Sequence, residues 1–409
     1  MAACFLFDCF GSYPCDIVCG MDFEAKLMYN GTVTTPQGFK AGAVASGIKN
    51  GRQLDLGILY SEAPCAAAAT FTTNKVKAAP VILSQHNLAG GRARAVVVNA
   101  GCANACTGER GAADAAEMAS IAADKLGIAA GDMVVASTGV IGVDLPMESV
   151  RSGLENMELT RNGGHDLARA IMTTDSRVKE VAVDIGGVKI GGIAKGAGMI
   201  HPNMATMLSF VTTDADVEPE FLSKALKKAV DVSFNMISVD GDTSTNDMVV
   251  ALANGLAGKP KPPDFESGLR AVCTYLARCI ASDGEGCTRL IEVRIEKAKT
   301  EEEARIAART VSSSTLVKTA MHSGDPNWGR IIAAIGRSGV DFDESKVDLY
   351  LNEVCVLKRG RLQLQDRRLI VTGDEVCITV SLNIGKGEAV AWGCDLSEEY
   401  VTINSEYTT

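Results

Sequence analysis

The chain has 409 residues, of which 46% are hydrophobic, 5% aromatic and 22% charged, and its formal net charge is −10. This length exceeds what one hydrophobic core usually supports, so we expect two or three lobes. The composition, with 41 glycines, is typical of a globular protein with many turns. The acidic balance argues against a nucleic-acid partner, which requires a basic face.

The N-terminal region lacks the signature of a targeting segment. No apolar run approaches the length of a membrane span, and no Lys or Arg precedes Lys26, as a secretory signal or a transit peptide would require. We therefore expect a cytoplasmic protein with no membrane partner. Residues 1–32 are interpreted as an N-terminal extension, or as an upstream start with Met21 or Met28 as the natural one.

The cysteines do not form a pattern that predicts a metal site. Four of the 13 lie within the first twenty residues, in a spacing that matches no zinc-binding motif. The others are scattered, which is typical of reduced and mostly buried thiols. We expect no bound metal.

The first half of the body favours strands with one long helix. Strand-like and turn-like residues fill 33–47, and an alanine-rich helix is predicted over 110–126, stopped by Gly127. A turn is expected at 137–139. Buried strands are predicted over 55–60, 66–73, 94–99 and 133–136. The clearest hairpin covers 180–192, because alternating residues flank a Gly-Gly pair that suits a two-residue turn.

The second half combines helices with strands. Amphipathic helices are predicted over 219–232 and 264–280, and the charged run 301–309 is interpreted as a solvated helix face. Strands are predicted over 290–295, 347–351, 369–371, 376–382 and 389–392. The expected fold class is α/β of the α+β type, with helices layered on mixed or antiparallel sheets.

The stretch Lys195-Gly-Ala-Gly-Met-Ile-His-Pro-Asn-Met-Ala-Thr-Met-Leu208 places a lysine and glycines ahead of Thr206. A threonine hydroxyl needs a neighbouring base to act as a nucleophile. Cleavage between Ala205 and Thr206 would supply one, because a free α-amine has a pKa of about 7.7–8. On pattern alone, a threonine in an apolar run is more often a core residue.

Two further segments carry candidate groups before this stretch. The segment Ser137-Thr-Gly-Val-Ile-Gly142 can aim backbone N–H groups at an anion, as an oxyanion hole requires, although a structural turn is the simpler interpretation. The segment Ile171-Met-Thr-Thr-Asp175 places two hydroxyls ahead of a carboxylate, a pattern also typical of a helix N-cap.

Four segments carry candidate groups after it. The carboxylate-rich run 239–247 lacks the layout of an EF-hand and is interpreted as a self-bonded polar turn. Glu285 follows the helix 264–280 in a glycine turn, 323–330 is a turn with a tryptophan, and the chain ends in the polar segment 404–409. On its own, each of these four segments is too common in proteins to indicate a function.

Together these motifs resemble, in order, those of the ornithine acetyltransferase (glutamate N-acetyltransferase) family, from Val33 to Thr409. The family pattern around the nucleophile reads Lys-Gly-Ser/Ala-Gly-Met-Ile-x-Pro-Asn-Met-Ala-Thr-Met-Leu. His201 departs from it, since a small residue is usual there, and Gly324 stands where Arg is usual. Residues 1–32 match nothing in this family.

The resemblance implies autocatalytic cleavage at Ala205–Thr206 into an α chain, 33–205, and a β chain, 206–409. It assigns Thr206 as the nucleophile and Thr138 and Gly139 as the oxyanion hole. The residues it assigns to substrate binding are Thr173, Lys195, Thr206, Glu285, Asn404 and Thr409, with Thr174 as the neighbour of Thr173 to test second.

The implied reaction moves acetyl from N-acetylornithine to glutamate with ping-pong kinetics in arginine biosynthesis. It needs no metal and no organic cofactor, and acetyl-CoA is a substrate only if a second activity is present. The family also implies an α2β2 heterotetramer and a fold like that of self-cleaving aminopeptidases.

Two other functions remain open at this point. A related self-cleaving aminopeptidase or amidohydrolase would keep the cut but pass acyl groups to water. A non-enzymatic binding protein with the same fold would remain one intact polypeptide. We expect the His201 side chain to turn outward and to leave cleavage unaffected.

Overall fold

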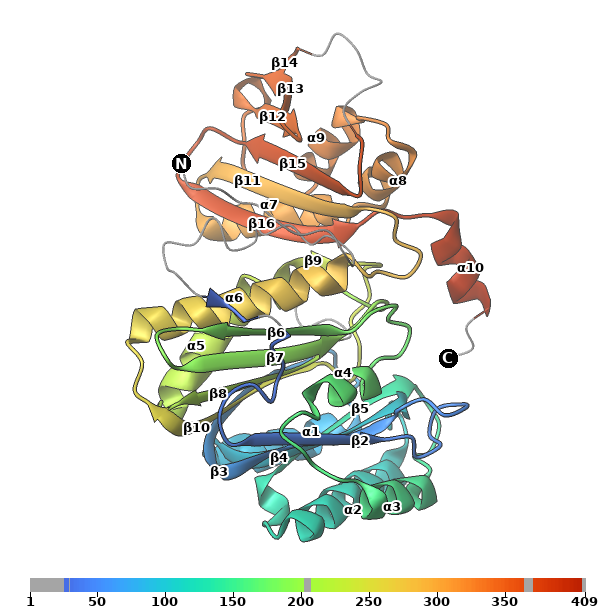
Figure 1. Ribbon diagram of the computed structural model, residues 1–409. Helices are drawn as coiled ribbons and strands as arrows, with labels where there is room; N and C mark the ends of the chain where they lie inside the picture. Colours follow the sequence, from blue (N-terminus) through green and yellow to red (C-terminus); the bar gives the residue numbers. More distant parts are fainter. Residues whose placement is uncertain (1–25, 29, 202–206, 364–370, 407–409) are drawn as a thin grey trace.

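The computed structural model describes residues 26–28, 30–201, 207–363 and 371–406. Two mixed β-sheets lie one above the other in Figure 1, with helices covering their faces. This arrangement confirms the expected fold class of helices layered on mixed sheets.

Among the described residues, the first sheet has nine strands in the order β1-β6-β7-β8-β10-β3-β4-β5, with β2 paired to β3. Its strands are β1 (Lys26–Leu27), β2 (Phe39–Val44), β3 (Leu56–Phe71), β4 (Arg92–Cys102), β5 (Met133–Val140), β6 (Lys179–Asp184), β7 (Lys189–Lys195), β8 (Leu208–Ala215) and β10 (Met248–Gly258). Because β1 pairs with β6, the sheet begins within the segment that the sequence analysis treated as an extension.

The strands on either side of the predicted cut are neighbours in this sheet. β7 pairs antiparallel with β8, with Lys195 opposite Leu208. β10 then lies between β8 and β3, parallel to the first and antiparallel to the second. A break between residues 205 and 206 would therefore leave two polypeptides that share one sheet, and residues 207–258 do not form a lobe separate from 33–201.

In the part of the chain that the structure describes, the second sheet has seven strands in the order β14-β13-β12-β15-β11-β16-β9. They are β9 (Ile237–Ser238), β11 (Leu290–Ala298), β12 (Asp348–Leu351), β13 (Val354–Lys358), β14 (Arg361–Leu362), β15 (Glu375–Ser381) and β16 (Gly387–Cys394). The predicted strand 369–371 lies mostly outside the described residues. The other four predicted strands of this half are confirmed.

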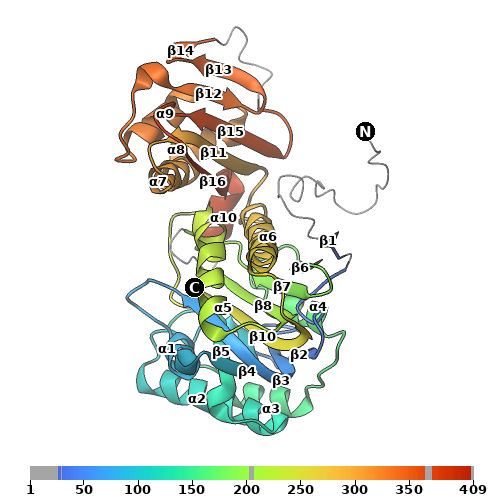
Figure 2. The same ribbon diagram turned by 90° about the vertical axis from the view of Figure 1, so that its left-hand side faces the viewer.

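Helix α6 (Pro262–Ala281) lies between the two sheets (Figures 1 and 2). A proline occupies its first turn, where the missing N–H costs nothing. Its predicted apolar face is buried in the core cluster that includes residues of both sheets. α6 therefore holds the two sheets together by hydrophobic burial.

The remaining helices pack beside one sheet or the other. Beside the first sheet are α1 (Ala79–Asn87), α2 (Gly108–Leu126), α3 (Met147–Asn156), α4 (Gly164–Ala170) and α5 (Pro219–Asp231); beside the second are α7 (Glu301–Ser312), α8 (Thr315–Ser323) and α9 (Trp328–Gly336); and α10 (Glu398–Glu406) follows β16. α7 is more than a solvated face, because Ala304, Ala307 and Val311 are buried. The turn 323–330 is structural: Gly324 ends α8 with a positive φ and Asn327 caps α9.

Two strand predictions need correction. The strands predicted at 55–60 and 66–73 are one 16-residue strand, β3, whose register against β4 shifts between Tyr60 and Cys65. A β-bulge or similar irregularity of this kind lets a strand continue through residues that read as a break. The turn predicted at 137–139 is wrong as well, because β5 continues to Val140.

Asp55 holds the loop that precedes β3. Its two carboxylate oxygens accept hydrogen bonds from the amide groups of 46–49, at 2.7–3.0 Å, and from the Ser46 hydroxyl at 2.8 Å. Ile48 and Lys49 of this loop pack against Gly101, where a Cβ atom would stand 3.1 Å from each side chain. By holding this loop, Asp55 also holds the side chains that pack against Gly101.

We predict that Asp55→Asn lowers the free energy of unfolding by about 3 kcal/mol, because an amide group would face N–H donors and each hydrogen bond to a charged group is worth about 1.5–3 kcal/mol. Urea unfolding measures the loss, with Asp124→Asn on the exposed face of α2 as the control. Equal stability of the two variants would contradict the role given to Asp55.

Candidate active site

Thr138 and Gly139 lie near the end of β5, beside β4. Gly139 has a φ of +132°, and a Cβ atom there would stand 2.3 Å from the carbonyl carbon of Gly101 and 2.6 Å from the amide nitrogen of Cys102. Only glycine permits this combination of φ and close backbone approach. The register of β4 against β5 shifts between Gly101 and Cys102, so this is an irregular strand end and not the turn that the sequence predicted.

Lys195 reaches this strand end from β7. Its side chain is buried, and Nζ donates to Thr138 Oγ1 at 3.3 Å. Burial lowers the pKa of Lys195, while the Asp175 carboxylate opposes that shift. The structure thus brings together two predicted site residues that are 57 positions apart in the chain.

Thr173 lies in the turn after α4, so the alternative of a helix N-cap is wrong. Its amide donates to Asp175 Oδ2 at 3.0 Å, and Asp175 Oδ1 accepts the Gly196 amide at 2.6 Å. Burial alone would raise the pKa of Asp175, but Lys179, Lys195 and the Gly196 N–H outweigh it and lower the pKa to about 2. One ionised carboxylate therefore joins the Thr173 turn to the residue after Lys195.

Glu285, in the turn after α6, meets Asn404 of α10 beside the segment that follows β7. Asn404 Nδ2 donates to Glu285 Oε2 at 2.9 Å, and the Glu285 amide donates to the Ala197 carbonyl at 2.9 Å. A Cβ atom on Gly198 would stand 2.5 Å from the Glu285 carboxyl. Figure 1 shows how this is possible, since α10 extends from the second sheet toward the first.

The run 239–247 supplies two carboxylates that sequence reasoning left without a role. Asp240 accepts the amides of Met199 at 2.5 Å and Ile200 at 2.9 Å. Asp247, which is 1% exposed, accepts the Met207 amide at 3.0 Å. Burial raises the pKa of Asp240, and it raises the pKa of Asp247 well above its usual range. The two carboxyls hold both ends of the segment that contains the predicted cut, and the density of acidic residues was the only signal for them.

Three predicted residues, Ala205, Thr206 and Thr409, lie outside the described residues. His201 borders the first two and is described. Its ring is half-buried, with Nδ1 3.2 Å from Ser238 Oγ of β9, so the expectation that it turns outward is wrong. The Ser238 hydroxyl is a polar partner for the ring within the protein interior. Burial lowers the pKa of His201.

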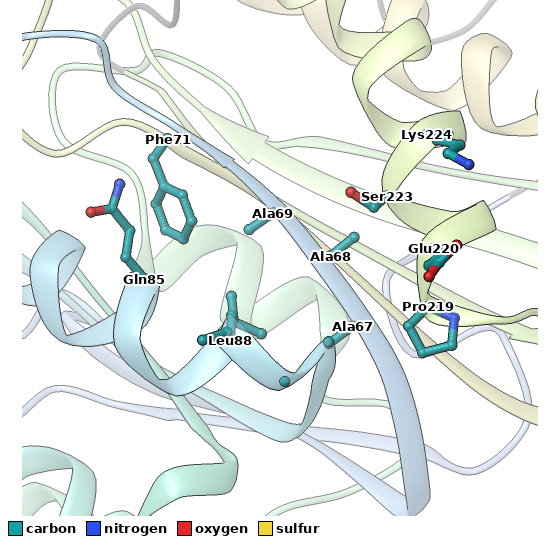
Figure 3. A pocket seen from close by; sticks show the side chains of 13 residues that line it. Ala67, Ala68, Ala69, Phe71, Gln85, Leu88, Pro219, Glu220, Ser223 and Lys224 are labelled. Atoms are coloured by element: carbon teal, nitrogen blue, oxygen red, sulfur yellow. The ribbon is translucent and has the colours of Figure 1, made fainter.

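A separate pocket of about 500 Å³ lies between α1 and α5 (Figure 3). Alanines of β3 form its floor, and its rim includes Gln85, Leu88, Pro219, Glu220, Ser223 and Lys224. It includes none of the predicted site residues.

Within the described ranges, no group of three or more His, Cys, Asp and Glu side chains could hold a metal ion, and no helix is long and apolar enough to cross a membrane.

Comparison with known proteins identifies the family. The profile of the ArgJ family matches residues 40–409. This chain belongs to the ArgJ family. It is 54% identical to the arginine biosynthesis bifunctional protein ArgJ of Dehalococcoides mccartyi, over 95% of this chain and 100% of that protein. The ArgJ protein of Symbiobacterium thermophilum is 52% identical, over 93% of this chain and 99% of that protein.

Two solved structures are also similar to this ArgJ-family chain. The ArgJ protein of Bacillus halodurans is 44% identical, with a TM-score of 0.48, over 49% of this chain and 100% of the solved one. The ornithine acetyltransferase of Mycobacterium tuberculosis, solved with ornithine, is 43% identical, with a TM-score of 0.41, over 44% of this chain and 98% of the solved one.

The low pKa of Asp175 predicts a pH dependence of stability. Its folded pKa of about 2 lies below the ordinary value of 3.8, so its stabilisation is complete above about pH 4 and is lost as the pH falls toward 2. We expect Asp175→Asn to remove about 2 kcal/mol of stability at pH 7 and to flatten the decline between pH 4 and pH 2. Urea unfolding at several pH values measures both effects. Parallel declines in the wild type and the variant would refute this assignment, and Asp166→Asn on exposed α4 is the control.

Proposed function

We propose that this ArgJ-family protein transfers acetyl from N-acetylornithine to glutamate through an acetyl-threonine intermediate on Thr206. The observation that carries the proposal is the convergence of Thr138, Gly139 and Lys195 beside the Glu285–Asn404 pair, at the two strands that flank residues 196–207. The motifs that resemble the ornithine acetyltransferase family supply the remaining groups.

Self-cleavage is the first step of the proposal. The Thr206 hydroxyl attacks the Ala205 carbonyl, the acyl group moves from nitrogen to oxygen, and water hydrolyses the ester. A carboxylate at Ala205 and a free amine on Thr206 result. Asp247 supports this step, because its bond to the Met207 amide holds the peptide that follows the reacting residue.

Acetyl transfer then uses the new amine as the base. It takes the proton of the Thr206 hydroxyl as that oxygen attacks the acetyl carbonyl, and the proton leaves with the ornithine amine. The α-amine of glutamate attacks the acetyl-threonine in the second half-reaction. Both halves pass through a tetrahedral oxyanion that Thr138 and Gly139 would stabilise.

Lys195 orients one of these oxyanion donors. An ammonium group can only donate hydrogen bonds, so Thr138 Oγ1 must accept the bond from Lys195. The hydrogen of the Thr138 hydroxyl is then free to point to the developing oxyanion. A lysine at this position also adds positive charge beside a carboxylate substrate.

The substrate ends are assigned by the same resemblance. Glu285 would pair with the cationic amine, since charge-assisted hydrogen bonds are roughly twice as strong as neutral ones. Thr173, Asn404 and Thr409 would complete the pocket.

The transfer needs no metal or organic cofactor, and acetyl-CoA would enter only in a second activity. We propose an α2β2 assembly of the two chains.

Thr206 variants test the reaction directly. We expect Thr206→Ala to remove cleavage and acetyl transfer together, while Thr206→Ser retains part of both because serine keeps the hydroxyl. N-acetylglutamate formation from N-acetylornithine and glutamate is the assay, and denaturing gels follow cleavage. Release of acetate in place of N-acetylglutamate would contradict the proposal and favour a hydrolase.

The oxyanion hole has a matched pair of test variants. Gly139→Ala forces a Cβ atom against the Gly101 and Cys102 backbone, and we expect kcat to fall about 10²–10³-fold, as for loss of one oxyanion donor. Gly142→Ala is the control, because Gly142 also has a positive φ but nothing lies within 4 Å of its added Cβ. Equal kcat values for the two variants would argue against this oxyanion hole.

A further inference from the structure

Lys179, the first residue of β6, is a buried charge that neither the motifs nor the proposed chemistry uses. Its side chain is 0% exposed, and Nζ lies 2.6 Å from Asp175 Oδ1 and 2.5 Å from Asp283 Oδ2. It also donates to the Arg177 carbonyl at 3.3 Å. Burying an ammonium is costly unless it is paired and fully hydrogen-bonded, and these three acceptors satisfy it.

Asp175, the first partner of Lys179, holds the backbone around Thr173 and Lys195. The same carboxylate accepts the amide of Thr173, a predicted substrate contact, and the amide of Gly196, which follows Lys195. The position of Lys179 therefore determines where both of these segments lie relative to β6.

Asp283, the second partner of Lys179, lies at the start of the turn that contains Glu285. Its carboxylate accepts the amide and the hydroxyl of Ser176. Two residues later comes Glu285, whose amide donates to the Ala197 carbonyl and whose carboxylate accepts Asn404. Lys179 thus joins the Glu285 turn to the turn that contains Thr173.

The two carboxylates lie on opposite sides of the predicted cut. Asp175 and Lys179 precede residue 205, whereas Asp283 follows residue 206. In the cleaved protein the two sets of substrate contacts would belong to different polypeptides, so their spacing would depend on non-covalent contacts such as this one.

We propose that Lys179 is a positioning residue for acetyl transfer, whose shared bonds to Asp175 and Asp283 keep the Thr173 and Lys195 segments in register with the Glu285 turn. The inference rests on the proposed function and deepens it. Lys179 touches no substrate in this account, and it acts on substrate affinity through the two carboxylates.

Lys179→Met tests this role, because methionine has a similar length and no charge. We expect KM for N-acetylornithine and for glutamate to rise about 10-fold or more, the size expected for loss of a charge-assisted hydrogen bond. We expect kcat to fall much less, because Thr138 and Gly139 stay in place. The control is Lys228→Met, which removes an exposed ion pair with Glu266 between α5 and α6.

A double variant distinguishes two effects of losing Lys179: the rise in KM from the lost bridge, and the loss of stability from an unpaired buried carboxylate. Lys179→Met with Asp283→Asn leaves no surplus carboxylate, so it should regain much of the melting temperature that Lys179→Met alone loses. It should still show the raised KM, because the bridge is missing. Should Lys179→Met fail to fold, Asp283→Asn alone, which keeps the side-chain shape, should raise KM in the same direction.

The outcomes distinguish this inference from the proposed function. A wild type that forms no N-acetylglutamate would overturn the proposed function and the inference with it. An active wild type whose Lys179→Met variant keeps its KM, or whose double variant recovers the wild-type KM along with its stability, would overturn the inference alone.

Discussion

The pairing of β7 with β8 is the constraint on which the site depends. Lys195 and Leu208 are opposite each other across this ladder, so the described ends of the segment 196–207 begin and finish at the same place in the sheet. Backbone hydrogen bonds from Asp240 and Asp247 fix the described parts of this segment near each end. The described ends of the segment that contains the predicted nucleophile therefore lie at the end of the sheet where Lys195 meets Thr138.

Buried charge organises the same region. Lys179, Lys195, Asp175 and Asp247 are all almost completely buried, where an unpaired ion would be costly. Two solutions occur side by side. Asp175 stays ionised because cations and an amide surround it, whereas burial raises the pKa of Asp247 well above its usual range. The carboxyl that accepts the Met207 amide and the carboxylate that accepts the Gly196 amide thus have pKa values shifted in opposite directions at the two ends of the loop.

The sequence could predict the local elements of this fold because their signals are local. The hairpin at Gly186-Gly187 and the apolar stripe of α6 need only their own residues, and both are confirmed. It could not predict that β3 runs through residues 61–65 or that β5 continues through Gly139. These features depend on pairing with β4, whose register shifts at both places.

The site was predictable only as a set of motifs. Resemblance indicated Thr138, Lys195, Glu285 and Asn404, and the structure brings them together in two contacting pairs. Lys179 and Asp247 were missed because their partners lie up to 104 positions away, and a single lysine or aspartate in a sequence does not reveal burial. Thr206 and Thr409 remain predictions, since they lie outside the described residues.

Intact-mass analysis of freshly purified protein, combined with sequencing of new N-termini, is the most direct test of the central claim. We expect two polypeptides that separate only under denaturing conditions, the second beginning at Thr206 and ending at Thr409. A single uncut polypeptide that forms N-acetylglutamate from N-acetylornithine at an undiminished rate would contradict it.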